Sequence, residues 1–233
     1  MNELYPPDRK TRLSLWPAHG GMAKKILLAI SLILIFLLVW VVFIYGSNSF
    51  DQKTFSLISP HITESRTRLM RFISFFGKHT FLIPVIILLL AYFLFKKNNW
   101  MAIRTAAVLL SSLLVMSLLK SLIQRQRPPD PLVEGITNYS FPSGHAFISV
   151  AFYGLLIWYV TIYINNKWLR RMVIFFLLLV IAAIGFSRIY LRVHYATDVI
   201  AGICIGFVWL DFCLWFIERK ESSRSAKKYS QRR

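Results

Sequence analysis

Cysteine is nearly absent from this chain, which has only two among its 233 residues. Cys204 and Cys213 stand nine positions apart, a spacing that fits neither a redox pair nor a metal-ligand motif. We therefore expect both to pack as small apolar side chains.

Acidic residues are also scarce: the chain has ten Asp and Glu residues but 28 Lys and Arg residues. The few acidic residues form no cluster with His or Cys at the spacing of a metal site. The sequence therefore predicts no metal and no other cofactor. The net charge of +18 is a property of many nucleic-acid-binding proteins, so the distribution of the basic residues has to decide between the possible partners.

Charge of either sign is missing from several long stretches. Residues 26–45 form a run without a charge, about the length that a helix needs to cross a hydrocarbon layer of ~30 Å. This run and the basic region before it exceed the limits of a signal peptide, so we expect a retained helix. Five more uncharged runs follow, at 81–95, 105–119, 146–164, 172–187 and 199–210. The sequence predicts an all-α polytopic membrane protein with six transmembrane helices.

The basic residues gather before the first run, between the second and third, between the fourth and fifth, and after the sixth. Alternate connections share one side of a membrane, and the positive-inside rule places that side, with both termini, in the cytoplasm. Most of the basicity is then a topology signal, and we expect no nucleic-acid partner. The domain plan is a polar N-terminal segment (1–22), one membrane domain (23–218) and a basic cytoplasmic tail (219–233) that we expect to be disordered.

Two further features need an interpretation. Asp211 lies well inside the sixth run, about 20 Å along a helix from Asp198 and toward the cytoplasmic end. There it could reach water or aromatic neighbours, so we expect a structural role, although carboxylates within a membrane are often functional. In the outward connection 46–78, apolar residues recur at helical spacing among basic ones from 66 to 78. This predicts a short amphipathic helix, lying at the outer interface or leading into the second span.

The outward connections carry ionisable residues at the membrane edge. In KSLIQRQRPP, Lys120 and Arg127 are seven residues apart, which on a helix puts them on one face about 10 Å apart along the axis. Pro128 and Pro129 then end the helix. A snorkelling lysine followed by solvated arginines is an equally good explanation of this segment alone.

The stretch FPSGHAF precedes the fourth apolar run. Ser143 can cap a helix, Gly144 lets the backbone approach a ligand closely, and a helix N-terminus binds anions. Capping explains the serine without any function. It does not explain His145, which suits a proton donor to a bound anion.

The third segment is SRIYLRVHYATD. His194 and Asp198 are four apart, so at the start of a helix they would meet on one face, where the carboxylate fixes the tautomer of the histidine. The alternative is a helix cap by Thr197 or Asp198, with His194 as a polar residue of the interface. All three segments share the outward face, and together they supply cations, two histidines, an aspartate and a helix N-terminus. These are the parts of a phosphate site with a nucleophile and an acid.

The three segments resemble the three-part signature of the type 2 phosphatidic acid phosphatase (PAP2) superfamily. The signature reads KxxxxxxRP, PSGH and SRxxxxxHxxxD, and residues 120–128, 142–145 and 187–198 match it at every fixed position and in order. The resemblance covers about residues 24–217 when the six-helix plan is included.

The resemblance implies a role for each matching residue. His194 would be the nucleophile that forms a phosphohistidine, with Asp198 orienting it and His145 acting as general acid and then base. The implied phosphate cradle consists of Lys120, Arg127, Ser143, Gly144 and Arg188. Arg125 and Arg192 lie outside the signature, and we interpret them as solvated side chains or lipid head-group contacts.

The resemblance implies a metal-independent lipid phosphatase of a bacterial plasma membrane, with its site facing the periplasm or exterior. Its expected partners are membrane lipids and a substrate such as undecaprenyl pyrophosphate, phosphatidylglycerol phosphate, phosphatidic acid or lipid A phosphate. One alternative is a phosphotransferase of the same superfamily that passes the phosphoryl group to another lipid. A channel, transporter or scaffold without enzymatic activity is the other, but the spans have few of the polar residues that it needs.

Overall fold

The computed structural model describes residues 21–45 and 48–230, and the regular elements within these residues are all helices. They are α2 (Met22–Tyr45), α3 (Ser49–Ile58), the 3-10 turn η1 (Ser59–His61), α4 (Glu64–Phe75), α5 (His79–Phe95), α6 (Asn99–Ile123), α7 (Gly144–Tyr163), α8 (Lys167–Tyr190) and α9 (Ala196–Ser230). Six stretches are long and apolar enough to span a membrane: Met22–Ile44, Glu64–Phe95, Asn99–Ile123, Gly144–Tyr163, Lys167–Tyr190 and Ala196–Arg219. The prediction of an all-α membrane protein with six spans is confirmed.

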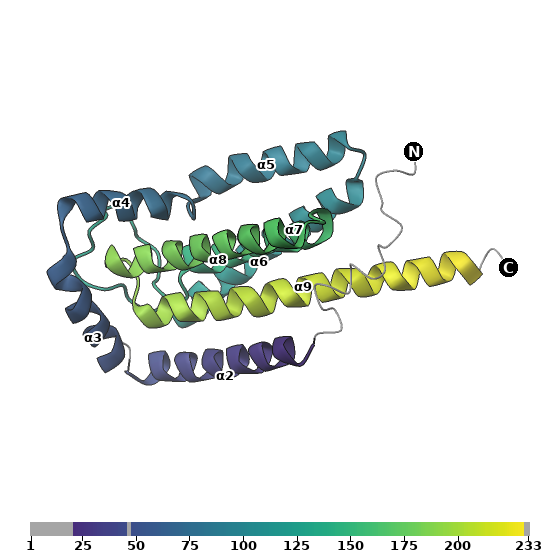
Figure 1. The fold of residues 1–233 in the computed structure, drawn as a ribbon. Coiled ribbons are helices and arrows are strands. Elements are labelled where there is room, and N and C mark those ends of the chain that lie inside the picture. Colours follow the sequence, from purple (N-terminus) through teal and green to yellow (C-terminus); the bar gives the residue numbers. More distant parts are fainter. Residues whose placement is uncertain (1–20, 46–47, 231–233) are drawn as a thin grey trace.

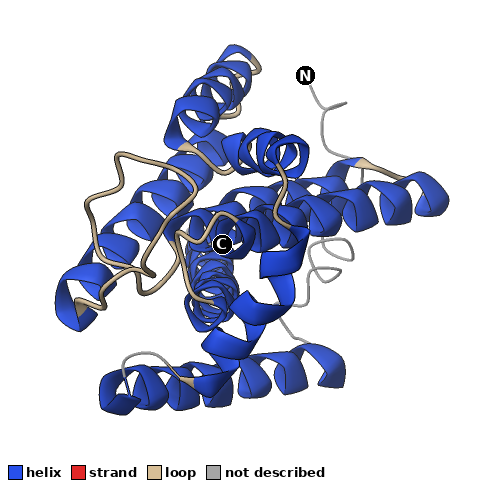
Figure 2. Ribbon diagram, turned by 90° about the vertical axis from the view of Figure 1, so that its left-hand side faces the viewer, coloured by secondary structure: helices blue, strands red, loops and turns tan. Residues whose placement is uncertain are grey.

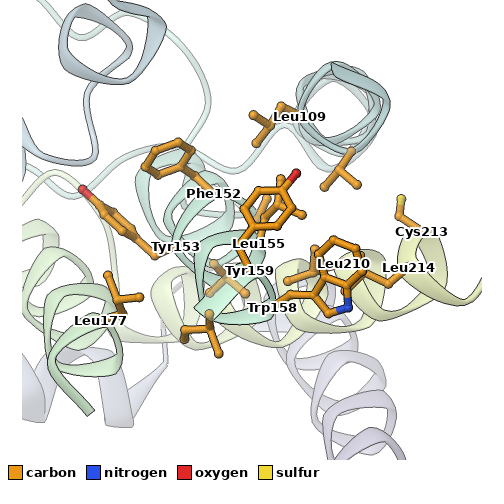
Figure 3. Close-up of a cluster of buried hydrophobic side chains, with 14 of the residues drawn as sticks. Leu109, Phe152, Tyr153, Leu155, Trp158, Tyr159, Leu177, Leu210, Cys213 and Leu214 are labelled. Atoms are coloured by element: carbon orange, nitrogen blue, oxygen red, sulfur yellow. The ribbon is translucent and has the colours of Figure 1, made fainter. Parts of the chain in front are cut away.

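Helix α7 is the centre of the bundle. It packs against α6, α8 and α9, and 67% of its span is buried, compared with 11% for α2 at the edge (Figure 1). Its large side chains, among them Phe152, Leu155 and Trp158, fill the core shown in Figure 3. Of the six spans found in the described residues, α7 is the least apolar and α2 the most apolar. Side chains that face lipid have to be apolar, whereas a helix surrounded by other helices can carry small and polar residues.

Glycine lets α9 approach the first turns of α7. A Cβ atom at Gly202 would lie 2.7 Å from the backbone oxygen of Ser143, and one at Gly206 would lie 2.9 Å from that of Phe147. Small residues at helix interfaces permit such close backbone contact in membrane proteins. The start of α7 is thereby held against the start of α9, and the residues of the second and third signature segments meet there.

Helices α3 and α4 lie at the end of the bundle opposite the C-terminal extension of α9 (Figure 1). Helix α4 packs against α8 and leads into α5 in one candidate span. The predicted amphipathic helix therefore exists, and the second of its two expected placements is the observed one. The Tyr190 hydroxyl fixes the corner before α4, because it donates to the His61 carbonyl (3.1 Å) and accepts from the Thr63 amide (3.2 Å).

Two predictions about helix ends are wrong. Helix α6 stops at Ile123 and Gln124 is left-handed, so Lys120 and Arg127 do not share a helical face. Toward the C-terminus, α9 continues to Ser230, where we expected a disordered tail from residue 219. Residues 231–233 and residues 1–20 of the polar N-terminal segment (1–22) lie outside the described part of the chain.

The end of the bundle far from the site is fixed by charge pairing. Asp211 of α9 forms an ion pair with Lys24 of α2, and both side chains are largely shielded from solvent. This pair supports the structural role expected for Asp211, with a lysine in place of the water or aromatic partners that we anticipated. Cys204 and Cys213 are buried and free, as expected for packing residues.

Candidate active site at one end of the bundle

The end of the bundle that carries α3 faces the viewer in Figure 2. The signature segments converge at this end, because Arg127 contacts Val193 and His194, and the Ser143 amide donates to the Asp198 carbonyl. The loop after α6 supplies Arg127, the start of α7 supplies Ser143 to His145, and the turn between α8 and α9 supplies His194. Tertiary structure thus brings together residues that are up to 78 positions apart in the signature.

His194 lies in the middle of this region and is 2% exposed. Its Nε2 atom lies 3.3 Å from the Arg127 guanidinium, and its Nδ1 atom faces the Ser140 hydroxyl (3.4 Å) and the Asp198 carboxylate (3.7 Å). A guanidinium only donates, so Nε2 must accept and the proton of the neutral ring belongs on Nδ1. Burial lowers the pKa of His194 to about 3, so the ring is neutral at physiological pH. Neutral imidazole with an unprotonated Nε2 is the nucleophilic form, and its lone pair has to be released from Arg127 before it can attack.

Asp198 divides its two oxygens between several donors. Oδ2 accepts from the Ser140 hydroxyl at 2.5 Å and from the Tyr195 amide at 2.9 Å, besides facing His194. The Tyr195 contact is one half of a capping box at the start of α9. The capping and the histidine-orienting interpretations are therefore compatible, because one carboxylate makes both contacts.

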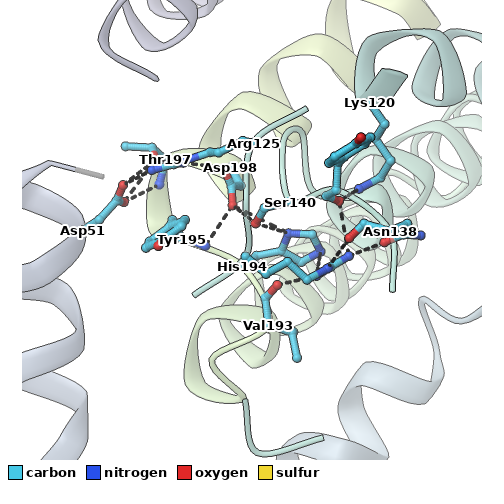
Figure 4. A network of polar contacts seen from close by, with 12 residues as sticks. Asp51, Lys120, Arg125, Asn138, Ser140, Val193, His194, Tyr195, Thr197 and Asp198 are labelled. Atoms are coloured by element: carbon cyan, nitrogen blue, oxygen red, sulfur yellow. Dashed lines mark hydrogen bonds and ion pairs between the residues drawn. The ribbon is translucent and has the colours of Figure 1, made fainter. Parts of the chain in front are cut away.

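Two of the predicted phosphate-binding cations donate to the same loop segment (Figure 4). Lys120 donates to the Tyr139 carbonyl, while Arg127 donates to the Asn138 side chain, to the Asn138 and Tyr139 carbonyls (2.6 and 3.3 Å), and to the Val193 carbonyl. These protein oxygens accept hydrogen bonds from the N–H groups of Lys120 and Arg127 that would otherwise be available to a phosphate. A bound phosphate would have to replace some of these oxygens as acceptors.

The first turn of α7 has the form of an anion site. Ser143 occupies the N-cap position, yet its buried hydroxyl makes no capping bond and has no hydrogen-bond partner among the described residues. Its backbone amide donates to the Asp198 carbonyl (3.0 Å), which ties α7 to the start of α9. A Cβ atom at Gly144 would lie 2.7 Å from the Met116 sulfur and 3.7 Å from Cε of Lys120, so this turn is close to α6. An unpartnered hydroxyl at a helix N-terminus is well placed to donate to an anion.

His145 and Arg188 complete the predicted set. His145 is partly exposed and lies within electrostatic reach of Arg188, His194 and Arg127. Its ring is near the α4–α5 corner, because a Cβ atom at Gly77 would lie 3.2 Å from it. Arg188 is buried at the end of α8, where one of its terminal nitrogens donates to Ser74 (2.5 Å) and its Nε has no partner. All eight predicted site residues therefore belong to this end of the bundle.

The interpretation of Arg125 as a solvated or head-group contact is wrong, whereas Arg192 is partly exposed, which fits the solvated side chain that we expected. Arg125 is 6% exposed and pairs with Asp198 and with Asp51 of α3. Arg192 donates to the Ser59 hydroxyl at 2.6 Å. Sequence reasoning also missed four polar participants, since no motif marks them and their contacts cross between elements: Asp51, Asn138, Ser140 and Thr197.

Residues 21–45 and 48–230 contain no group of three or more His, Cys, Asp or Glu side chains arranged to hold a metal ion. The charge that could neutralise a phosphate comes instead from lysine and arginine. This arrangement can bind a phosphate group, attack it with an imidazole nitrogen and supply a proton from a second imidazole.

The family model described as the PAP2 superfamily matches residues 101–222, which is more than half of the chain and includes all three signature segments. This protein belongs to the PAP2 superfamily. The resemblance deduced from the motifs is thus confirmed.

Relatives agree with this PAP2 assignment. The chain is 30% identical to phosphatidylglycerophosphatase B of Bacillus subtilis over 58% of this chain and 68% of that protein. It is 31% identical to an undecaprenyl-diphosphatase of Sulfolobus acidocaldarius over 78% of this chain and 86% of that protein. The fold matches the crystal structure of a transmembrane PAP2-type phosphatidylglycerolphosphate phosphatase from Bacillus subtilis, with a TM-score of 0.75 and 23% identity over 82% of this chain and 96% of that one. This PAP2 protein is therefore a multi-pass membrane protein with phosphatases among its relatives.

Proposed function

We propose that this protein is a phosphatase that hydrolyses the phosphate monoester or pyrophosphate of a membrane lipid through a phosphohistidine on His194. The observation that carries the proposal is the setting of His194. Its Nε2 faces Arg127 and its Nδ1 faces Ser140 and Asp198, within a region of lysine and arginine side chains. Relatives named as phosphatidylglycerophosphatase and undecaprenyl-diphosphatase support a lipid substrate.

In the first step, Lys120, Arg127 and Arg188 bind the phosphate, with help from the Ser143 hydroxyl and the Gly144 amide. Nε2 of His194 attacks phosphorus, and the bond to the leaving oxygen breaks as His145 gives that oxygen a proton. The Nδ1 proton stays on the ring and points toward Ser140 and Asp198. The negative charge of the Asp198 carboxylate stabilises the imidazolium that forms. The cations stabilise the charge on the three equatorial oxygens of the transition state.

In the second step, neutral His145 takes a proton from water as the water oxygen attacks the phosphohistidine. The phosphorus–nitrogen bond breaks, its electrons return to Nε2, and inorganic phosphate leaves. Each proton and electron pair is then back at its starting place, and no metal is required. A lipid hydroxyl in place of water would give the phosphotransferase reaction instead.

The position of the site suits a substrate that stays in the bilayer. Basic residues gather at the far end of the spans, in the connection 96–98 and in the first turn of α8 (167–171), and the positive-inside rule puts that end in the cytoplasm. The site would then face the outside of a bacterial plasma membrane. A lipid could keep its chains between the helices while its head group enters the site from the membrane edge.

The test is phosphate release by purified protein in detergent with EDTA present. Undecaprenyl pyrophosphate, phosphatidylglycerol phosphate, phosphatidic acid and lipid A are presented side by side to the wild type and to His194→Ala. We expect release by the wild type only, and the order of rates indicates the preferred lipid. Transfer of phosphate to an added acceptor lipid, seen by thin-layer chromatography, would favour the phosphotransferase, and a strict metal requirement would contradict the mechanism.

A further inference from the structure

The Arg125 side chain lies between two buried carboxylates that belong to different helices (Figure 4). One terminal nitrogen of its guanidinium donates to Asp198 Oδ1 at 2.5 Å, and the other donates to Asp51 Oδ2 at 2.8 Å. The Arg125 side chain is 4% exposed and both carboxylates are fully buried. Buried charges of this kind persist only where they are paired and hydrogen-bonded; both terminal nitrogens of Arg125 are paired, and its Nε has no partner among the described residues.

The contacts of Asp198 give Arg125 a connection to the nucleophile. Asp198 Oδ1 accepts a hydrogen bond from Arg125. Asp198 Oδ2 accepts from the Ser140 hydroxyl and the Tyr195 amide, and it faces Nδ1 of His194. A carboxylate is planar and rigid, so fixing the direction of one oxygen also fixes the direction of the other. Arg125, together with Ser140 and the Tyr195 amide, therefore fixes the Asp198 oxygen that faces Nδ1 of His194.

Arg125 is in turn held from three sides. The terminal nitrogen of Arg125 that donates to Asp198 also donates to the Thr197 hydroxyl at 2.8 Å. The Arg125 guanidinium lies over the Tyr195 ring, 4.0 Å from the ring centre. Asp51 accepts from the Thr197 amide at 3.0 Å and from the Thr197 hydroxyl. Asp51 and Thr197 thus define the plane of the Arg125 guanidinium. Because a guanidinium is planar and donates from two edges, it can bind the Asp51 and Asp198 carboxylates at the same time.

We propose that Arg125 is a positioning residue that orients the Asp198–His194 pair, with Asp51 as the counter-ion that sets the plane of its guanidinium. The inference rests on the proposed function of His194 as the nucleophile. The competing explanation is that Arg125 only anchors α3 to the bundle. Arg192 offers a control for that explanation, because it reaches α3 through the Phe55 ring and the following turn η1 through Ser59. None of its contacts with the described residues involves Asp198.

The first experiment compares Arg125→Met, Arg125→Lys, Asp51→Asn and Arg192→Met in phosphate release. We expect Arg125→Met to lower kcat roughly 100-fold with KM within about threefold, because the substrate still binds while the nucleophile is misdirected. Arg125→Lys keeps the positive charge but lacks the two donating edges of the guanidinium, so its kcat should lie between those of Arg125→Met and the wild type. Asp51→Asn should show a smaller loss of kcat, and Arg192→Met should keep kcat near that of the wild type. Equal losses for Arg125→Met and Arg192→Met would overturn the proposal.

The second experiment places Arg125→Met in an Asp198→Asn background. If Arg125 acts through Asp198, the second substitution costs less than about twofold once the carboxylate is gone. A purely structural role predicts the full loss of the single variant again, and that result would refute the inference. If Arg125→Met does not fold, Arg125→Lys goes through the same cycle with the same criterion.

The third experiment needs no substrate and so separates this inference from the proposed function. Nitrogen NMR of the histidine rings in detergent reports which nitrogen carries the proton, and His194→Ala assigns the His194 signal. We expect the Nδ1-protonated form in the wild type and in Arg192→Met, and a mixture of both tautomers in Arg125→Met. An unchanged tautomer in Arg125→Met would contradict the inference, whereas a wild type that releases no phosphate would contradict only the proposed function.

Discussion

A substitution of Gly202 by alanine tests whether the catalytic geometry depends on the contact between α7 and α9. Gly202 touches none of the proposed reacting groups. It lies one turn after Asp198 on α9, and its missing side chain faces the backbone at the start of α7. The added Cβ would lie 2.7 Å from the Ser143 carbonyl, 3.2 Å from the Ala146 Cβ and 3.3 Å from the Phe147 amide.

The size of the effect follows from these distances. A comfortable contact is about 3.4 Å or more, so the start of α7 has to move away from α9 by roughly 0.7 Å. Ser143 and His145 move with α7, while Asp198 remains on α9. Because a misplacement of about 1 Å costs on the order of 100-fold in rate, we expect kcat to fall roughly 10- to 100-fold. Overpacking costs about 1–3 kcal/mol, and the better helix propensity of alanine offsets about 1 kcal/mol of that cost.

Gly154→Ala is the matched control on the same helix interface. A Cβ there would lie 2.5 Å from a methyl group of Leu210, which can rotate away, and the position is about 15 Å along α7 from its first residue. Phosphate release and unfolding in mixed detergent are measured for both variants. A Gly202→Ala protein with wild-type kcat, or a Gly154→Ala protein with an equal loss of kcat, would refute the reasoning.

Three more predictions follow from the site. Asp198→Asn should still fold and bind substrate but lose about 10³- to 10⁴-fold in kcat, because the histidine loses its orienting charge; near-normal turnover would exclude that role. Asn138→Ala should lower KM about two- to tenfold and strengthen inhibition by inorganic phosphate, because a competitor for the Arg127 donors is removed; a higher KM would show that Asn138 instead holds Arg127 in place. His194 has a pKa of about 3 when folded and about 6.5 when unfolded, so the unfolded chain binds the proton first as pH falls. The free energy of unfolding should therefore decline from about pH 6.5 toward pH 3, by up to roughly 1.4 kcal/mol per pH unit from this group; a His194→Gln protein that declines equally steeply would contradict the assignment.

The long loop between α6 and α7 shows what could not be predicted from the sequence. Two prolines and the spacing of Lys120 and Arg127 suggested a helix that carries both cations on one face. The chain leaves the helix four residues earlier, and Arg127 returns to the site by donating to Asn138 and Val193. These are contacts between segments, and local spacing has no information about them. Arg125 was misread for the same reason, because a buried ion pair and an exposed arginine have the same local sequence.

The sequence by itself determined the six spans, the order of the signature segments and the family, because uncharged length and fixed motif spacing are local properties of the chain. It also indicated the His194–Asp198 pair, although His194 lies two residues before α9, so the two side chains meet across the turn that starts the helix and not on one helical face. Only the tertiary structure decided which neighbouring polar side chains hold the His194–Asp198 pair in position. Ser140 and Arg125, which come from segments 58 and 73 positions before Asp198, donate to its carboxylate, and Asp51 pairs in turn with Arg125. Close packing at Gly202 and the pairing of buried charges leave one arrangement.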